Sequence, residues 1–179
     1  MRGRGATMKN LKTAVALACA VAATAAAGRA ADVDDATQKT LTANYALACT
    51  AASNPSDANL DAAFANLAPD FVNVDPTGKQ ESRDQVVSLG KQQLKMLHAT
   101  ACSNKIDSIS ATDPNTIVVV NTLHLEGDVT TPDGKHALIL TDKAQDTWKN
   151  VGGKWMEGQS KDLHVLVQID GNVVQDLGS

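Results

Sequence analysis

Hydrophobic and polar positions follow two different periods along this chain. In residues 32–97, apolar side chains recur every three or four positions, a spacing that predicts helices. From residue 106 onward, β-branched runs and alternating apolar and polar positions predict strands instead. The chain therefore combines a helical first half with a strand-rich second half.

Three helices are expected in the first half. One covers 32–52, with Leu41, Tyr45, Ala48 and Ala52 on one face. A second begins after Ser56, a good N-cap residue, carries Leu60, Ala63, Phe64 and Leu67, and ends at Pro69. A short strand over 71–75, a turn and a return strand over 79–81 precede the third helix. Its start is marked by a capping box, Ser82 to Gln85, and its inner face comprises Val86, Leu89, Gly90, Gln93, Leu94 and Leu97.

Four strands are expected in the second half, over residues 106–111, 116–126, 136–150 and 154–169. Asp113-Pro114-Asn115, Thr131-Pro132-Asp133-Gly134 and Gly152-Gly153 supply the turns between them. Three helices followed by an antiparallel meander define an α+β fold. A strongly curved sheet capped by helices would enclose a ligand pocket at its mouth.

Residues 1–30 have the features of a signal peptide, which leaves 31–179 as a single domain. A basic segment without acidic residues precedes an alanine-rich apolar run over 13–27, followed by small residues suited to cleavage. That run is too short for a comfortable membrane span, so no span is expected after cleavage. An uncleaved N-terminal anchor is the alternative. The expected location is periplasmic or secreted.

Removal of this leader changes the charge of the chain. The full sequence has a net charge of −4, but residues 1–30 contain five of the basic residues and no acidic one. The mature chain therefore carries 11 basic and 20 acidic residues, a net charge of −9. Such a surface repels phosphate backbones, so nucleic acid is not an expected partner.

Leader removal also leaves two cysteines, Cys49 and Cys102. In an exported chain such a pair predicts one disulfide, which would close a loop of 54 residues. The alternative is two separately buried thiols. Neither cysteine has a basic neighbour in sequence that would activate a thiolate.

Three local segments in this order resemble the nuclear transport factor 2-like (NTF2-like) superfamily, in particular its small SnoaL-like bacterial domains. The first is the strand and turn Phe71-Val72-Asn73-Val74-Asp75-Pro76-Thr77-Gly78-Lys79, and the second is the helix start Ser82-Arg83-Asp84-Gln85-Val86. The third is the hairpin in which Asp146-Thr147-Trp148 is followed by Gly153-Lys154-Trp155. The resemblance covers residues 34–169.

This resemblance implies a cone-shaped, curved antiparallel sheet wrapped around three N-terminal helices, with a cavity inside. Such domains are often homodimers, and a homodimer is expected here. The superfamily includes isomerases, cyclases and dehydratases as well as binding proteins without a known reaction, so the fold does not by itself assign a function. Where many relatives have a histidine after the second tryptophan, this chain has Lys161.

Candidate site residues come from period-2 alternation on the last two strands. Asp142, Ala144, Asp146 and Trp148 share one face, as do Trp155, Glu157, Gln159, Lys161 and Leu163. If these faces line the cavity, Asp142 with Glu157 or Lys161 forms a polar cluster, and His124 on the preceding strand joins it. The alternative is a solvated outer face. The expected pocket residues are Tyr45, Phe71, Asp142, Trp148, Trp155, Glu157, Gln159 and Lys161.

Two chemistries find no support in the sequence. Gly158-Gln159-Ser160-Lys161-Asp162 lacks the second glycine of a nucleophile elbow and lies in a predicted strand. The four histidines include no pair at i, i+4 and no H-E-x-x-H motif, so no metal site and no cofactor are expected.

Three functions remain open. The first is an exported binding domain without catalysis, taking a small apolar or amphipathic molecule. The second is an isomerase, cyclase or dehydratase in which Asp142 or His124 moves a proton. The third is a protein-interaction module that uses a dimer interface or the open sheet face.

Overall fold

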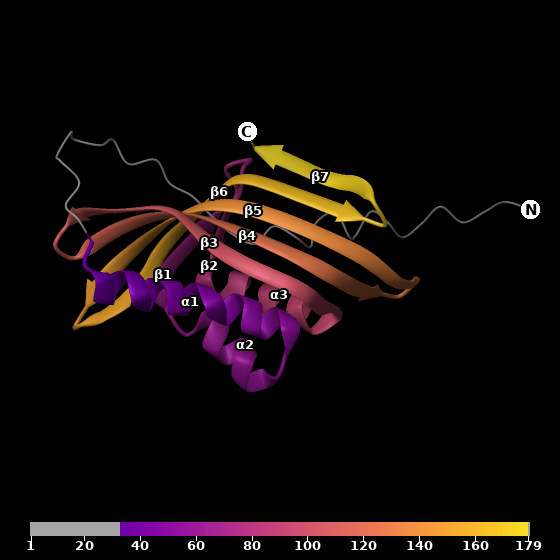
Figure 1. The fold of residues 1–179 in the computed structure, drawn as a ribbon, viewed down its shortest axis with the longest axis horizontal. Helices are drawn as coiled ribbons and strands as arrows, with labels where there is room; N and C mark the ends of the chain where they lie inside the picture. Colours follow the sequence, from indigo (N-terminus) through magenta and orange to yellow (C-terminus); the bar gives the residue numbers. More distant parts are fainter. Residues whose placement is uncertain (1–32, 179) are drawn as a thin grey trace, which may run out of the picture.

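The computed structural model describes residues 33–178, and the signal peptide expected over 1–30 lies outside them. Within this range, three helices gather on one face of a single curved, seven-stranded sheet (Figure 1). The α+β class and the cone-like arrangement predicted from the sequence are confirmed. None of the helices described is long and apolar enough to cross a membrane.

Each helix begins directly after an N-cap residue, although the first helix was expected to begin three residues earlier, at residue 32. In α1 (Asp35–Ser53), Asp34 is the N-cap and accepts a hydrogen bond from the Thr37 backbone. In α2 (Asp57–Phe64), the expected Ser56 is the N-cap. In α3 (Arg83–Met96), both hydrogen bonds of the Ser82–Gln85 capping box are present. These helix starts are determined locally, because each cap satisfies backbone N–H groups that would otherwise lack partners.

Several strands are longer than the sequence pattern predicts, while the strand over 154–169 has the predicted bounds. The sheet order is β2-β1-β6-β5-β4-β3, and β7 also pairs with β6. Because β1 runs parallel to β6 while the other pairs are antiparallel, the sheet is mixed. The strands are β1 (Leu67–Val74), β2 (Gln80–Ser82), β3 (Leu97–Asp113), β4 (Thr116–Thr131), β5 (Gly134–Val151), β6 (Lys154–Ile169) and β7 (Asn172–Gly178).

Three sequence predictions in the helical half are wrong. Leu97 was expected on the inner face of the third helix, but α3 ends at Met96 and Leu97 begins β3. Leu67 was expected on the second helix, but α2 ends earlier and Leu67 begins β1. Pro69 lies within that strand, in the irregular stretch between the Leu67 and Val72 pairings with β6, where a missing N–H is tolerated. Leu89, expected on the inner face of α3, is 41% exposed.

Three groups of buried apolar side chains form the core between the helices and the concave face of the sheet. One group lies on the long strands, one around Tyr45 and Trp148, and one where α2 and α3 meet β1. Members of all three groups line one internal cavity. The packing of the core therefore leaves a space at the centre of the domain.

Candidate functional site

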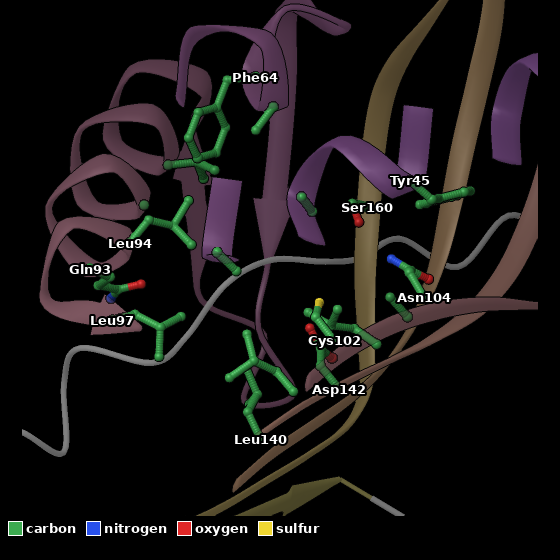
Figure 2. A pocket seen from close by; sticks show the side chains of 18 of the residues that line it. Tyr45, Phe64, Gln93, Leu94, Leu97, Cys102, Asn104, Leu140, Asp142 and Ser160 are labelled. Atoms are coloured by element: carbon green, nitrogen blue, oxygen red, sulfur yellow. The ribbon is translucent and has the colours of Figure 1, made fainter. Parts of the chain in front are cut away.

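The cavity has a volume of about 220 Å³ and lies between the helices and the concave face of the sheet (Figure 2). A cavity of roughly 150 Å³ holds benzene, and sites for drug-sized ligands begin at roughly 300 Å³. This cavity therefore suits a small molecule. Its apolar lining includes Ala48, Ala52, Ala63, Phe64, Leu67, Phe71, Val86, Leu94, Met96, Leu97, Leu123, Leu125, Val129, Leu138, Leu140 and Ala144.

Polar side chains line one end of the cavity, and Asp146 on β5 is at their centre. One of its carboxylate oxygens accepts hydrogen bonds from the Tyr45 hydroxyl and from the Asn121 side-chain amide, each at 2.6 Å. The other oxygen accepts one from the Ser160 hydroxyl. Helix α1 and strands β4, β5 and β6 are thus joined through one buried carboxylate.

Trp148 contacts Tyr45 and fixes the position of its side chain. Its indole N–H donates to the Tyr45 hydroxyl at 2.9 Å, and the two rings pack edge to face with centroids 5.7 Å apart. Burial and the charge of Asp146 raise the pKa of Tyr45. The phenol therefore keeps its proton and donates a hydrogen bond to Asp146. Trp148 itself is 2% exposed and supports the site without lining the cavity.

Burial dominates the electrostatics of the acidic groups at this end. It raises the pKa of Asp146 to about 6, although hydrogen bonds from Ser160, Tyr45 and Asn121 act in the opposite direction. Burial and the nearby charge of Asp146 also raise the pKa of Glu157. Because these carboxyl groups share one low-dielectric region, the negative charge of one ionised group disfavours ionisation of its neighbours.

Asp142 differs from Asp146 because its carboxyl has unused hydrogen-bonding capacity. It lines the cavity and is 7% exposed, and its Oδ1 has no hydrogen-bond partner among residues 33–178. Burial and then the charge of Asp146 raise its pKa well above the ordinary range. Asn104, which also lines the cavity, likewise has an Oδ1 without a partner in the described part of the chain.

Four of the residues predicted for the pocket line the cavity: Tyr45, Phe71, Asp142 and Glu157. Trp155 instead packs against the apolar group around Tyr45 and Trp148. The alternation predicted for β5 is confirmed, since Asp142, Ala144, Asp146 and Trp148 are all buried on one face.

The prediction for Gln159 and Lys161 is not met, because a β-bulge reverses the alternation of β6. Adjacent residues Thr147 and Trp148 of β5 pair with Gln159 and Glu157, so Gly158 is an extra residue. One extra residue moves the side chains that follow it to the opposite face, and a second extra residue, Leu163, restores the original face for the rest of β6. Ser160 consequently faces the cavity, and neither Gln159 nor Lys161 lines it.

His124 does not line the cavity either. Its Nδ1 lies 3.1 Å from Thr141 Oγ1 and its Nε2 lies 3.1 Å from Glu126 Oε1. The buried face of β4 carries the odd-numbered positions Ile117, Val119, Asn121 and Leu125, so His124 points the other way. The structure thus removes His124 from the set of candidate acid–base groups.

Sequence reasoning missed Asn104, Asn121 and Ser160. A signal existed for Asn121, because it is the polar residue within the apolar series Ile117, Val119, Leu123 and Leu125. Ser160 had no usable signal, since its orientation depends on the bulge. No group of three or more His, Cys, Asp or Glu side chains among residues 33–178 is arranged to hold a metal ion.

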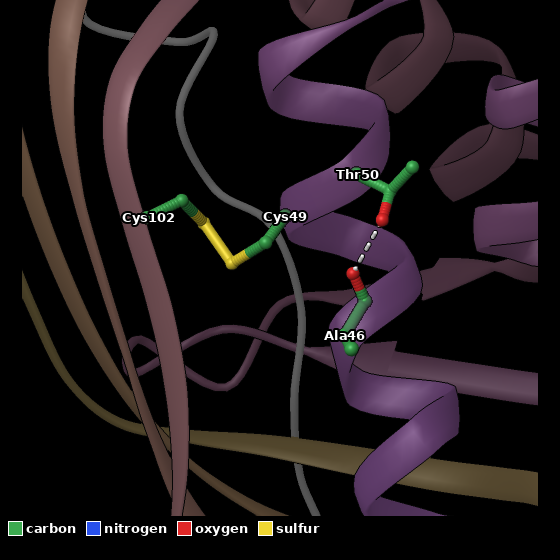
Figure 3. Close-up of a disulfide and its surroundings, with 4 residues drawn as sticks. All are labelled: Ala46, Cys49, Thr50 and Cys102. Carbon is green, nitrogen blue, oxygen red and sulfur yellow. Dashed lines mark hydrogen bonds between the residues drawn. A yellow bond between two sulfur atoms is a disulfide. The ribbon is translucent and has the colours of Figure 1, made fainter.

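The Cys49–Cys102 disulfide joins α1 to β3 beside the cavity, with the two Cα atoms 5.4 Å apart (Figure 3). Cys102 also lines the cavity. The next residue of α1 after Cys49 is Thr50, whose hydroxyl donates to the Ala46 carbonyl at 3.1 Å, within the same helix. The predicted pairing is confirmed, and it anchors the helix that carries Tyr45.

No protein-family model and no curated protein sequence matches this chain. Solved structures do match it. An NTF2-like protein from Cytophaga hutchinsonii superposes with a TM-score of 0.55 at 15% identity, covering 73% of this chain and 98% of its own. A conserved protein from Planctomyces limnophilus gives a TM-score of 0.61 at 14% identity, covering 76% and 99%.

A ketosteroid isomerase-like protein from Erwinia carotovora atroseptica gives a TM-score of 0.51 at 13% identity, covering 79% of this chain and 99% of its own. The resemblance predicted from the sequence is thereby confirmed at the level of architecture. The chain has the NTF2-like fold, which accommodates many functions, so the function must be argued from the cavity.

Proposed function

We propose that this protein binds a small, mainly apolar molecule that carries one polar group, inside the central cavity. The observation that supports this proposal is Asp142, which lies at the polar end of a mainly apolar cavity. Its buried Oδ1 has no hydrogen-bond partner among the described residues. A buried polar group without a hydrogen bond is costly, and a ligand that supplies the bond removes that cost. The apolar lining favours the ligand body, and Asp142 favours its polar end.

Filling the cavity is expected to abolish binding. Leu140→Trp adds bulk on the cavity side of β5, whereas Ile139→Trp places the same side chain at the neighbouring, 36%-exposed position. In an NMR titration with 2-phenylethanol, wild type and Ile139→Trp should show chemical-shift changes at residues that line the cavity. Leu140→Trp should bind 2-phenylethanol at least tenfold more weakly than wild type. Equal binding by both variants, or shifts confined to the outer face, would contradict the proposal.

A proton-transfer enzyme is the second candidate, and the raised pKa of Asp142 favours it. A cavity-facing carboxyl with a pKa above its ordinary range is poised to exchange a proton with a bound substrate. This candidate is the isomerase, cyclase or dehydratase that the sequence analysis left open. Asp142 is its proton-transfer group, while the phenol of Tyr45 is already committed to Asp146.

Carbon–hydrogen exchange tests the proton-transfer candidate. In D₂O, wild type is expected to accelerate deuterium incorporation at the α-carbons of cyclohexanone, and Asp142→Asn to lose at least a factor of about 100 of that acceleration. Asp70→Asn, at an exposed position of β1, is the matched control and should retain it. Exchange by Asp142→Asn at the wild-type rate would eliminate this mechanism.

Export is part of the proposal. The leader pattern over residues 1–30 supports it, and the Cys49–Cys102 disulfide is compatible with an oxidising, periplasmic or extracellular location. The homodimer and the interaction module that uses the open face of the sheet stay predictions.

A further inference from the structure

Hydrogen-bond donors at the acidic end of the cavity are already engaged within the protein. The hydroxyls of Tyr45 and Ser160 and the amide of Asn121 all donate to Asp146. Tyr45 in turn accepts from the Trp148 indole, which completes its hydrogen bonding. A ligand that accepted a hydrogen bond from one of these three groups would therefore have to displace it from Asp146.

The buried side-chain atoms left without a partner there are acceptors. Among the described residues that line the cavity, the side-chain atoms buried without a partner are Asp142 Oδ1 and Asn104 Oδ1, both oxygens. Asp142 is more than nine-tenths buried. Asn104 on β3 and Asp142 on β5 both pair with Leu123 of β4, so the two face the cavity with one strand between them. Gln93, the remaining uncharged polar lining residue, comes from α3, on the other side of the cavity.

The charges at this end all have one sign. Asp142, Asp146 and Glu157 line the cavity, and no lysine, arginine or histidine is among the lining residues in the described chain. A ligand with a carboxylate would add a further negative charge in a low-dielectric space, which is strongly unfavourable. A cationic ligand would instead favour the ionised form of Asp142, which burial disfavours.

We propose that the polar group of the ligand is a protonated primary or secondary amine that binds Asp142, with Asn104 as a second acceptor. This inference rests on the proposed binding function and specifies the class of ligand. An ammonium group donates up to three hydrogen bonds and accepts none, which matches the unpartnered oxygens. A buried ion pair is favourable only when its remaining hydrogen bonds are satisfied, and Asn104 provides for this.

The competing ligand class is a neutral alcohol or ketone bound to protonated Asp142, and a matched set of probes separates the two. 2-Phenylethylammonium, 2-phenylethanol and 3-phenylpropanoate have similar apolar bodies and differ in the charge of the head group. By titration calorimetry at pH 7.5, the amine is expected to bind wild type at least tenfold more tightly than the alcohol, and the carboxylate more weakly than either.

Two variants test whether Asp142 is responsible for the preference for the amine over the alcohol. Asp142→Asn keeps the shape of the side chain and removes its charge, and should reduce the amine preference below threefold. Asp162→Asn is the matched control, because Asp162 is also buried and unpartnered within residues 33–178 but does not line the cavity. It should retain the full preference. The wild-type comparison of amine and alcohol stands even if one variant does not fold.

Attraction of amines to the acidic surface must be distinguished from binding in the cavity. Exposed charges are screened by salt, whereas a buried pair is screened much less. The amine preference should therefore persist in 0.5 M NaCl and disappear in Leu140→Trp. Loss in salt, or retention in Leu140→Trp or in Asp142→Asn, would overturn the inference.

The inference and the binding function fail in different ways. If wild type binds the alcohol as tightly as the amine, or more tightly, the cavity is a binding site but its ligand is not an amine. If wild type binds none of the three probes, the proposed binding function fails together with the inference.

Discussion

Replacing Cys49 and Cys102 together by serine should lower the free energy of unfolding by about 4 kcal/mol. The disulfide connects residues 53 positions apart, and in the chain-entropy model a loop of this length loses roughly that much stabilisation when it is opened. Typical domains unfold at a cost of only about 5–15 kcal/mol. Loss of the disulfide should therefore remove a large share of the total stability.

Urea unfolding of wild type, reduced wild type and the double serine variant measures this effect. Reduced wild type should match the variant, because both lack the same covalent constraint. Tyr45 lies one helical turn before Cys49 on α1, so loosening of this helix should also weaken 2-phenylethanol binding. Two reactive thiols in denatured, unreduced protein would show that the pairing is absent.

Replacing Asp162 by asparagine should stabilise the protein, on the order of 5 kcal/mol at pH 8 and far less at pH 4. Asp162 is 1% exposed, and neither of its carboxylate oxygens has a hydrogen-bond partner among residues 33–178. Burial raises its pKa to about 9. At pH 8 folding therefore requires this carboxyl to take up a proton that the unfolded chain has lost, which costs free energy, whereas asparagine has nearly the same shape and needs no proton.

The sign of the pH dependence follows from proton binding. Between pH 4 and 9 the folded protein keeps the Asp162 proton while the unfolded chain, with an ordinary pKa of 3.8, has lost it. Wild-type stability attributable to this group therefore falls as pH rises through that window, by up to about 1.4 kcal/mol per pH unit.

Urea unfolding from pH 4 to 9 should show a gap between Asp162→Asn and wild type that widens with pH. The exposed-site control Asp70→Asn should give a pH-independent difference within about 0.5 kcal/mol. A constant gap for Asp162→Asn would mean that Asp162 has an ordinary pKa in the folded protein.

Local signals in the sequence predicted much of the fold. Ser56 and the Ser82–Gln85 pair mark helix starts because capping involves only neighbouring residues. Alternation on β5 correctly placed Asp142 and Asp146 on one buried face, because that face follows from a strict period of two. The end of α2 was missed, because pairing of Leu67 with β6 outweighs its helical spacing.

The candidate site was predicted less completely, because it depends on interactions between distant segments. The inward orientation of Ser160 requires the extra residue at Gly158, which is visible only once β6 is paired with β5. His124 was expected to point inward, but the buried face of β4 is the one that carries Asn121. Strand β7 had no clear sequence signal and is held by its pairing with β6.

The sequence by itself determined the class of fold, the starts of α2 and α3, the cysteine pair and the shared face of Asp142 and Asp146 on β5. Each depends on short-range geometry, on a strict period or on a residue count. The tertiary structure alone decided that Asp146 is satisfied by Tyr45, Asn121 and Ser160 while Asp142 is left with an unpartnered oxygen. Those partners are separated by up to 101 positions along the chain, and only the curvature and register of the sheet bring them together.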